Sequence, residues 1–228
     1  MRNSLIIIKK QLKDTLRNKT VLIQFILFPV MTLIMENAIR IDGMPEFFFT
    51  KLFSVMYIGM APLTSVASII SEEKEKNTLR VLTMANVRPW QYLLGVGLYV
   101  WSICMLGAGV MATGLPRGDV PFYLSVMAIG FAISVLAGAC IGIYSRNQMT
   151  ATSLVMPVML IFAFCPMLAM FNSSIEKVAR FLYTQQLRSI MDNMTFRGMR
   201  TADIFILFIN AMVMVFLFFI TFRKKGLE

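Results

Sequence analysis

The sequence predicts an all-α, polytopic membrane protein with six transmembrane helices, an N-terminal interfacial amphipathic helix and short external helices before the last span. Two observations support this class. Hydrophobic residues make up 57% of the 228 residues, only 15% are charged, and the mean hydropathy is +0.71. In addition, the apolar residues form six blocks that approach the roughly 20 residues a helix needs to cross a hydrocarbon core about 30 Å thick.

The predicted spans belong to a single transmembrane domain, residues 1–228. The first span is the shortest, because its charge-free window ends at Glu36. The other five windows are long enough without help. The expected bounds of the spans are 20–39, 52–70, 91–113, 122–143, 151–171 and 203–222.

Residues 3–18 are expected to form a helix that lies in the membrane interface. At about 100° per residue, one helical face collects the apolar residues Leu5, Ile8, Leu12 and Leu16. Beside it stand Lys9, Lys10, Lys13 and Arg17, whose stems can extend toward lipid phosphates. The alternative is a helix packed on a soluble core. A signal peptide is not expected, because no small-residue cleavage pattern follows Met35 and further apolar blocks do.

Glu36 is the acid that falls within the depth of a predicted span, and acids at membrane depth are candidates for function. It stands at the outer end of the first span, with Arg40 one turn later. The favoured interpretation is an interfacial ion pair between these two residues. The alternative is a relay for protons or cations.

The distribution of Lys and Arg over the loops predicts that both termini are cytoplasmic. Most of the 22 basic residues then lie on cytoplasmic segments, including the loop 71–90 and residues 223–225. The net charge of +10 indicates membrane orientation and contact with anionic lipid rather than nucleic acid. Basic residues are scattered over the loops instead of gathered on one face, as a nucleic-acid site would require.

A dense mixed-charge run, SEEKEKNTLR at residues 71–80, lies between the second and third predicted spans. It continues as VLTMANVRPWQYLLG, where Pro89 begins a helix and Trp90 and Tyr92 suit the interfacial belt. Taken alone, the run can simply be a solvated loop in which Glu72 and Lys76 pair one helical turn apart.

Small residues and prolines stand inside the predicted spans. Every fourth residue of one face of the fourth span is small, namely Gly130, Ser134, Gly138 and Gly142. Such a stripe lets two helix backbones approach closely, either within one chain, which is the simpler interpretation, or between two subunits. Pro29, Pro157 and Pro166 are expected to kink the first and fifth spans, and we assign them no gating role.

Residues 173–202 form the largest predicted region outside the bilayer on the far side. Apolar residues recur there at helical spacing, at Tyr183, Leu187, Ile190, Met191 and Met194. This spacing predicts an amphipathic helix that lies on the membrane surface.

Several kinds of catalytic site are excluded. The chain has no G-x-x-x-x-G-K-[ST] motif, so it cannot build the phosphate-binding loop of an ATPase. It contains no His, which excludes His-based acid–base chemistry. Cys104, Cys140 and Cys165 fall singly within spans and lack the paired spacing of a zinc site. We therefore expect no enzymatic activity, metal or cofactor in this chain.

The stretch SEEKEKNTLRVLTMANVRPWQYLLG resembles the signature of the type-2 ABC exporter permeases. In that family a mixed-charge stretch, a Thr-Leu-Arg core, a turn and a Tyr-Leu-Leu-Gly entry into the third span recur together. The similarity extends over the whole chain, from the interfacial helix to the amphipathic insertion before the last span. Asn77 departs from the pattern, which usually has Gly, although Asn also adopts the left-handed conformation of such a turn.

The resemblance implies that residues 71–90 form a coupling loop that docks on a separate ATP-binding subunit. The contacts expected from it are Glu72, Glu73, Lys74, Glu75, Thr78, Leu79 and Arg80. ATP and Mg would be held by two copies of that partner, and a second permease copy or a homologue would complete the transporter. The external helices within 173–202 would cap the exit of the pathway.

The expected function is therefore the membrane-spanning subunit of an ATP-driven exporter in the plasma membrane of a bacterium or archaeon. Spans without charge and the lack of a large external domain favour an amphipathic peptide, drug or lipid-like cargo. A permease for a polysaccharide or haem-type substrate is one alternative. A membrane sensor or enzyme subunit without transport is another, but a sensor needs a cytoplasmic output domain and an enzyme needs polar residues clustered on one cavity.

Overall fold

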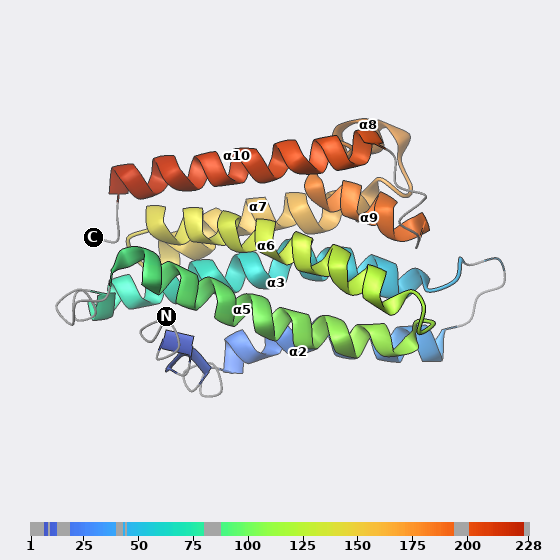
Figure 1. The fold of residues 1–228 in the computed structure, drawn as a ribbon, viewed down its shortest axis with the longest axis horizontal. Helices are drawn as coiled ribbons and strands as arrows, with labels where there is room; N and C mark the ends of the chain where they lie inside the picture. Colours follow the sequence, from blue (N-terminus) through green and yellow to red (C-terminus); the bar gives the residue numbers. More distant parts are fainter. Residues whose placement is uncertain are drawn as a thin grey trace.

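The computed structural model describes residues 7–8, 10–12, 19–39, 43, 45–79, 88–193 and 201–225. Helices make up nearly all of this part of the chain, and no strand occurs in it. The predicted all-α class is confirmed (Figure 1). With the labels of Figure 1, the elements are α2 (Lys19–Ala38), α3 (Phe48–Glu75), α5 (Pro89–Met111), the short 3-10 helix η1 (Ala112–Gly114), α6 (Val120–Tyr144), α7 (Gln148–Leu168), α8 (Ser173–Ala179), α9 (Tyr183–Asn193) and α10 (Thr201–Lys225).

The long helices are those of a multi-pass membrane protein. Within the described ranges, five helices are long and apolar enough to cross a membrane, and α2 contributes a shorter apolar stretch, Leu22–Ala38. The five are Phe48–Glu75, Pro89–Gly114, Val120–Tyr144, Gln148–Leu168 and Thr201–Lys224. Breaks between them coincide with charge or with Pro and Gly, as at Pro116–Asp119, where apolar periodicity stops.

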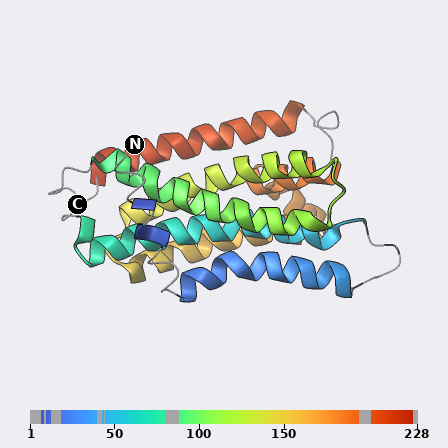
Figure 2. The same cartoon turned by 60° about the horizontal axis from the view of Figure 1, so that its bottom comes forward.

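The helices run side by side as a bundle with α3 in its middle. Helix α3 packs against α2, α5, α6, α7 and α9. Helix α10 contacts α6 and α9 on one side of the bundle, whereas α2 contacts α3 and α5 on the other, an arrangement visible in both Figures 1 and 2. Helix α3 is therefore the central helix of the bundle, and the other helices surround it irrespective of their order along the chain.

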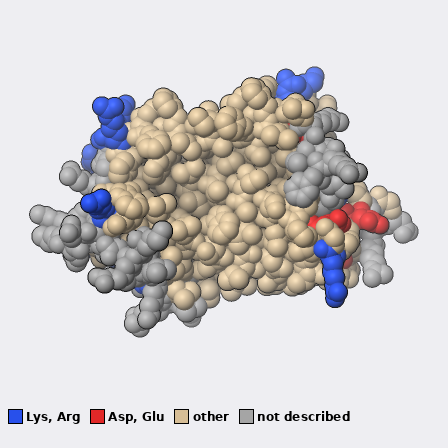
Figure 3. Space-filling model, in the orientation of Figure 1, with Lys and Arg blue, Asp and Glu red and all other residues tan. Residues whose placement is uncertain are grey.

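Charged side chains are confined to the two ends of the bundle. The face drawn in Figure 3 is uncharged across its middle and has Lys, Arg, Asp and Glu toward its ends. We call the end where α3, α6 and α10 finish and α5 and α7 begin the basic end. Its described basic residues are Lys10, Lys74, Lys76, Arg88, Arg146, Arg223 and Lys224, and they outnumber the acids Glu72, Glu73 and Glu75. An uncharged band between charged ends is what contact with a bilayer requires.

The small residues of α6 bring it into close contact with α3 of the same chain. A Cβ atom added to Gly138 would lie 2.5 Å from the carbonyl oxygen of Leu63, and one added to Gly142 would lie 2.8 Å from the Cβ of Ile70. At Gly130 the neighbours are Ile58 of α3 and Leu187 of α9. The predicted stripe therefore packs inside this chain, where the absence of side chains lets two backbones meet.

Ser134, the fourth member of the stripe, repairs a gap in the hydrogen bonding of α3. Pro62 lies inside α3 and has no N–H to donate to the carbonyl of Ile58, four residues earlier. The Ser134 Oγ donates to that carbonyl at 2.6 Å and also forms a 2.8 Å hydrogen bond with the Tyr183 hydroxyl. A carbonyl left free in hydrocarbon is costly, so this contact makes a proline tolerable in the most buried helix.

The same arrangement occurs between α2 and α3. Pro29 inside α2 leaves the carbonyl of Phe25 without its helical donor. The Tyr57 hydroxyl of α3 donates to this carbonyl at 3.2 Å. Two prolines are thus matched by hydroxyl donors from neighbouring helices, which fixes the rotation of each helix against the next.

Candidate functional site

Helix α3 continues past the end of the predicted span and includes residues 71–75, the first quarter of the predicted loop. Its regular part ends at Glu75, and the chain then turns at Lys76 and Asn77. Asn77 has a φ of 55°, so Asn adopts the left-handed conformation expected at this position. Thr78 follows, and its Oγ1 donates to the Glu73 carbonyl at 3.0 Å. This hydrogen bond folds the turn back on the helix that precedes it.

Glu73 points into the chain. Its side chain is 9% exposed, and its Oε1 accepts hydrogen bonds from Lys10 Nζ at 2.7 Å and from Gln11 Nε2 at 2.5 Å. The buried Tyr92, in the first turn of α5, interacts electrostatically with the same carboxylate. Ile7 packs nearby, because a Cβ on Gly95 of α5 would lie 2.9 Å from it. Glu73 therefore joins the N-terminal segment to the ends of α3 and α5.

Lys10 was expected to extend toward lipid phosphates, and the structure differs. Its ammonium pairs with Glu73 instead, while its side chain stays 37% exposed. The physical reason is that Glu73 is buried, and a buried carboxylate gains more from a close cation than a solvated phosphate does. Of the predicted N-terminal helix, residues 7–8 and 10–12 are described and are helical. Lys9, Lys13 and Arg17 lie outside the described residues.

Lys74 and Glu75 connect α3 to the two helices that meet beside it. The Lys74 Nζ donates to the carbonyl of Ile143, in the last turn of α6, at 2.8 Å. Glu75 Oε2 accepts from the backbone N–H of Gln148, the first residue of α7, at 2.8 Å. A cation at a helix C-terminus and an anion at a helix N-terminus both match the helix dipole. The two bonds hold the α6–α7 connection against the end of α3.

The outward surface of this region is small. Glu72 and Lys76 form an ion pair at 2.5 Å, with side chains that are 29% and 64% exposed. Asn77 beside them is exposed, whereas Leu79 is buried. Of the predicted contact residues that the structure describes, Glu72 and Glu75 are the acids with charge at the surface: Glu72 is half-buried on this ion-paired edge, and Glu75 is exposed beside it. Glu73, Lys74, Glu75, Thr78 and Leu79 make contacts within the chain, and Arg80 lies outside the described residues.

Sequence reasoning missed the intramolecular partners of this region, namely Lys10, Gln11, Tyr92, Ile143 and Gln148. Each stands about one helix or more away along the chain, so no local spacing reveals it. The available signal is limited to Glu72 and Lys76, which lie one turn apart and so share one side of α3. That spacing does not identify which helices meet the other sides.

Glu36 caps the other end of α3, at its first turn. Its Oε2 accepts from the backbone N–H of Thr50 at 2.8 Å and from the Thr50 Oγ1 at 3.0 Å. Phe47, which precedes α3, provides no side-chain cap, so Glu36 satisfies one of the free N–H groups of the first turn. Arg40, its predicted ion-pair partner, lies outside the described residues.

The predicted surface helix is instead inserted among the spans. Tyr183, Leu187, Ile190 and Met191 of α9 are all buried, and α9 contacts α3, α6, α7 and α10. The shorter α8 precedes it and packs on α7. The apolar spacing was read correctly, but it matches a bundle rather than a membrane surface. Met194 lies outside the described residues.

The end of α3, residues 71–79, connects several segments of the chain through polar contacts. Three segments meet there through hydrogen bonds and an ion pair, namely the N-terminal segment, α3 and the α6–α7 connection. The buried Tyr92 places the start of α5 beside the same carboxylate. Within the described ranges, no group of three or more His, Cys, Asp or Glu side chains could hold a metal ion. The arrangement can pass a displacement of one segment to the others.

A family model described as ABC-2 family transporter protein matches residues 2–223 of the chain. The match includes every described helix except the last two residues of α10, and it includes the end of α3 with residues 71–79. No curated protein shows significant similarity to the chain.

Proposed function

The chain belongs to the ABC-2 transporter family, and from this premise we propose that it is the membrane-spanning subunit of an ATP-driven exporter, coupled through residues 71–90 to a separate ATPase. Membership and the apolar helices make it a multi-pass membrane transport subunit rather than an enzyme. In the proposed assembly, two permeases, identical or homologous, pair with two ATPase subunits. Those partners bind ATP and Mg.

The observation that carries the coupling proposal is the set of contacts at the end of α3. Lys74 bonds to α6, Glu75 to α7, and Glu73 to Lys10 of the N-terminal segment. These three side chains point away from α3 in different directions, and each already has a bonding partner within the chain. Among the described residues, the surface that remains outward is the edge formed by Glu72, Lys76 and Asn77, next to the exposed Glu75.

The separation between internal contacts and an outward edge supports a specific mechanism. A partner that closes on the outward edge pushes on the last turn of α3, and the three internal contacts carry the push to α6, α7 and the N-terminal segment. Because α3 packs on most other helices, its displacement changes their relative positions and so the access of the pathway. Charges on the rim of such a contact give orientation, while affinity comes from buried side chains.

The proposed orientation places the basic end in the cytoplasm, with both chain termini. It follows the excess of basic over acidic residues there, which membranes favour on the cytoplasmic side. The proposed cargo is an amphipathic peptide, drug or lipid-like molecule, in keeping with described spans whose buried polar residues are mostly hydroxyls, while the buried acids Glu73 and Asp203 lie near helix ends. The proposed location is the plasma membrane of a bacterium or archaeon.

The test is purification of the tagged chain from its native membrane, followed by identification of bound subunits and an ATPase assay. The informative variant is Glu72→Ala with Lys76→Ala, which removes the outward ion pair. Its matched control is Glu176→Ala with Lys177→Ala, an exposed acid–base pair on α8 at the opposite end. A third variant, Glu73→Gln, alters an internal contact and leaves the outward edge unchanged.

We expect an ATP-binding subunit to co-purify with the unaltered chain and with the α8 control. The Glu72/Lys76 variant should recover several-fold less of it. Glu73→Gln should retain the subunit but lose most of the dependence of ATPase activity on the permease. If gentle detergent and nanodisc preparations both yield the chain without an ATPase, the exporter proposal fails. If the ATPase binds the Glu72/Lys76 variant normally, the outward edge is not the docking site.

A further inference from the structure

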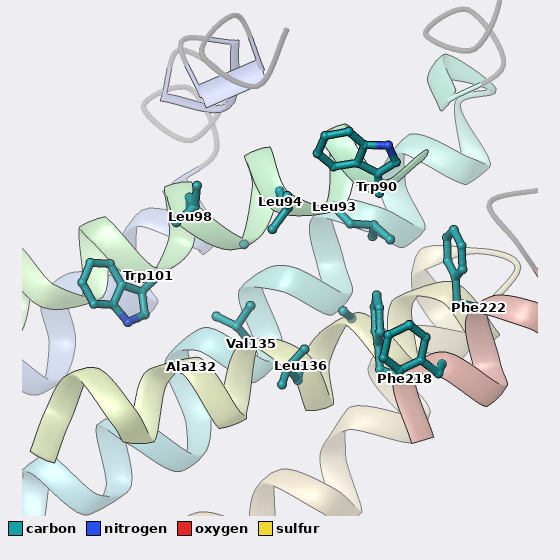
Figure 4. A pocket seen from close by; sticks show the side chains of 13 residues that line it. Trp90, Leu93, Leu94, Leu98, Trp101, Ala132, Val135, Leu136, Phe218 and Phe222 are labelled. Atoms are coloured by element: carbon teal, nitrogen blue, oxygen red, sulfur yellow. The ribbon is translucent and has the colours of Figure 1, made fainter. Parts of the chain in front are cut away.

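An apolar groove of about 640 Å³ runs along the outer face of α5, α6 and α10. Helix α6 contacts both neighbours and lies between them, with Ala132 and Val135 among the lining residues. Trp90 and Trp101 line it from α5, and Phe222 lines it from α10 (Figure 4). No residue that lines the groove is charged.

The groove is about as long as one leaflet of a bilayer is thick. On α5 its lining extends from Trp90 to Trp101, which at about 1.5 Å per residue is roughly 16 Å. Half of a hydrocarbon core of about 30 Å is roughly 15 Å. Trp90 is 49% exposed at one end, at the depth where Trp rings favour the interface. At the deep end, the Trp101 Nε1 donates to the Ala128 carbonyl at 3.0 Å, so its ring offers the groove an apolar surface.

The shallow end of the groove opens beside basic residues. Arg88 stands two residues before Trp90, and Arg223 and Lys224 directly follow Phe222. All three side chains are exposed, and none forms an ion pair with another described residue. The groove therefore combines an apolar channel with positive charge at the level of the lipid head groups.

We propose that this groove holds one acyl chain of an anionic phospholipid from the leaflet at the basic end, with the lipid phosphate near Arg88, Arg223 and Lys224. The match of lengths favours a lipid over a helix of a second protein, because such a helix would cover α5 and α10 along their whole length. The match of charge favours an anionic head group, since each basic residue near a membrane surface strengthens binding to anionic lipid. The inference is independent of the cargo and of the ATPase.

The two Trp residues of the chain provide the readout, because both line the groove and the sequence has no others. The full chain is reconstituted in phosphatidylcholine vesicles that contain a minor fraction of dibromostearoyl phosphatidylglycerol, or the same fraction of dibromostearoyl phosphatidylcholine. Bromine atoms quench Trp fluorescence on contact. The ratio of the two quenching constants measures the preference for the anionic lipid at the groove.

Two variants test the two halves of the site. Arg223→Gln with Lys224→Gln removes charge at the mouth, and Ala132→Phe fills the deep end at an exposed position of α6. The control, Arg117→Gln with Lys177→Gln, removes two exposed charges from the opposite end. Size-exclusion chromatography shows that each variant is folded before it is reconstituted.

We expect the anionic lipid to quench several-fold more strongly than phosphatidylcholine in the unaltered chain and in the control. The preference should fall to nearly one in the Arg223/Lys224 variant, because the loss of each basic residue is expected to weaken binding of the anionic lipid by about fivefold. It should also fall in Ala132→Phe, which keeps every charge. Equal quenching by the two lipids, or a preference that survives the Arg223/Lys224 variant, overturns the proposal. Absence of quenching by either lipid overturns it too, because the groove is then covered by protein.

Discussion

Helices α3 and α10 are both long, apolar and able to cross a membrane, yet they have opposite surroundings. In the most apolar 18-residue window of each helix, 78% of α3 is buried within the chain and none of α10 is. Thr50, Ser54, Ser65, Ser71 and Glu73 of α3 are buried polar residues. Large apolar side chains such as Phe205, Phe208 and Phe216 of α10 are exposed.

The contrast shows what places one helix in the middle of the bundle and another at its surface. Lipid tails are as apolar as Leu, so apolar character alone draws no helix into the bundle. Close backbone contact at small residues and hydrogen bonds between helices hold α3 in the middle, whereas α10 has few of either. The following predictions test this difference, from the largest expected effect to the smallest.

Replacing Gly138 by Leu should disrupt the contact between α3 and α6. Even the first added carbon would lie 2.5 Å from the Leu63 carbonyl oxygen, and backbone cannot move aside as a side chain does. We expect a loss above about 3 kcal/mol in the free energy of unfolding, measured by titration with dodecyl sulfate. Gly109→Leu is the control, because a Cβ there meets nothing within 4 Å. Equal losses in both variants would contradict the packing of α6 on α3.

Replacing Glu73 by Gln should weaken the attachment of the N-terminal segment to α3. The variant loses the charged acceptor that is bound to Lys10 and Gln11. We expect a loss of about 1–2 kcal/mol in the free energy of unfolding. Glu72→Gln should cost less than about 0.5 kcal/mol, because its ion pair is exposed. Hydrogen exchange at residues 7–12 should rise in the first variant alone, and an unchanged rate would argue against the contact.

Replacing Ser134 by Ala should remove the hydrogen bond that compensates for the missing N–H of Pro62. The Ile58 carbonyl then loses its donor, at an expected cost of about 1 kcal/mol in the free energy of unfolding. In a Pro62→Ala background the new N–H supplies that carbonyl, so the cost of Ser134→Ala should shrink. Ser125→Ala, on the exposed side of α6, is the control. Additive effects of the Pro62 and Ser134 changes would show that the two residues are not coupled.

Replacing Phe208 by Leu on α10 should change stability least. Phe208 is 63% exposed, and Leu is equally soluble in lipid, so the expected change is below about 0.5 kcal/mol. Phe131→Leu in α6 should cost about 1 kcal/mol, since Phe131 is fully buried against Tyr57 at a ring distance of 5.4 Å. If Phe208→Leu destabilises the chain as much as Phe131→Leu does, another protein covers α10.

Hydropathy was enough to predict the helices, because a bilayer imposes length and the absence of charge on any segment that crosses it. It could not rank α3 above α10, since both satisfy that requirement. The apolar spacing placed α9 on the membrane surface for a related reason, because an apolar stripe fits a membrane surface and a bundle equally well. The family resemblance, in contrast, implied short helices there that dip back toward the membrane. Pro62 was overlooked as well, since its partner Ser134 is identified by the rotation of α6 and not by any local spacing.

The sequence indicated where charge gathers but not what each charged side chain contacts. The run SEEKEKNTLR coincides with the end of α3, because dense charge next to a span must lie outside the hydrocarbon, and its role as a docking site stays a prediction. The direction of each side chain could not be read, since it depends on which face of α3 meets α5, α6 and α7. Glu73 and Glu75 therefore stood beside Glu72 in the prediction, although they bind Lys10 and Gln148.

Because α3 continues without a break through residues 71–75, it also fixes the distance of these residues from the hydrocarbon core. Its charge-free stretch, residues 52–71, is roughly 30 Å long and so equals the hydrocarbon thickness. The four residues that follow raise Glu75 roughly 6 Å farther on the same helix. Any molecule that meets Glu72 or Lys76 is therefore held at a distance from the bilayer that is set by a count of residues, and each turn added or removed there changes that distance by about 5.4 Å.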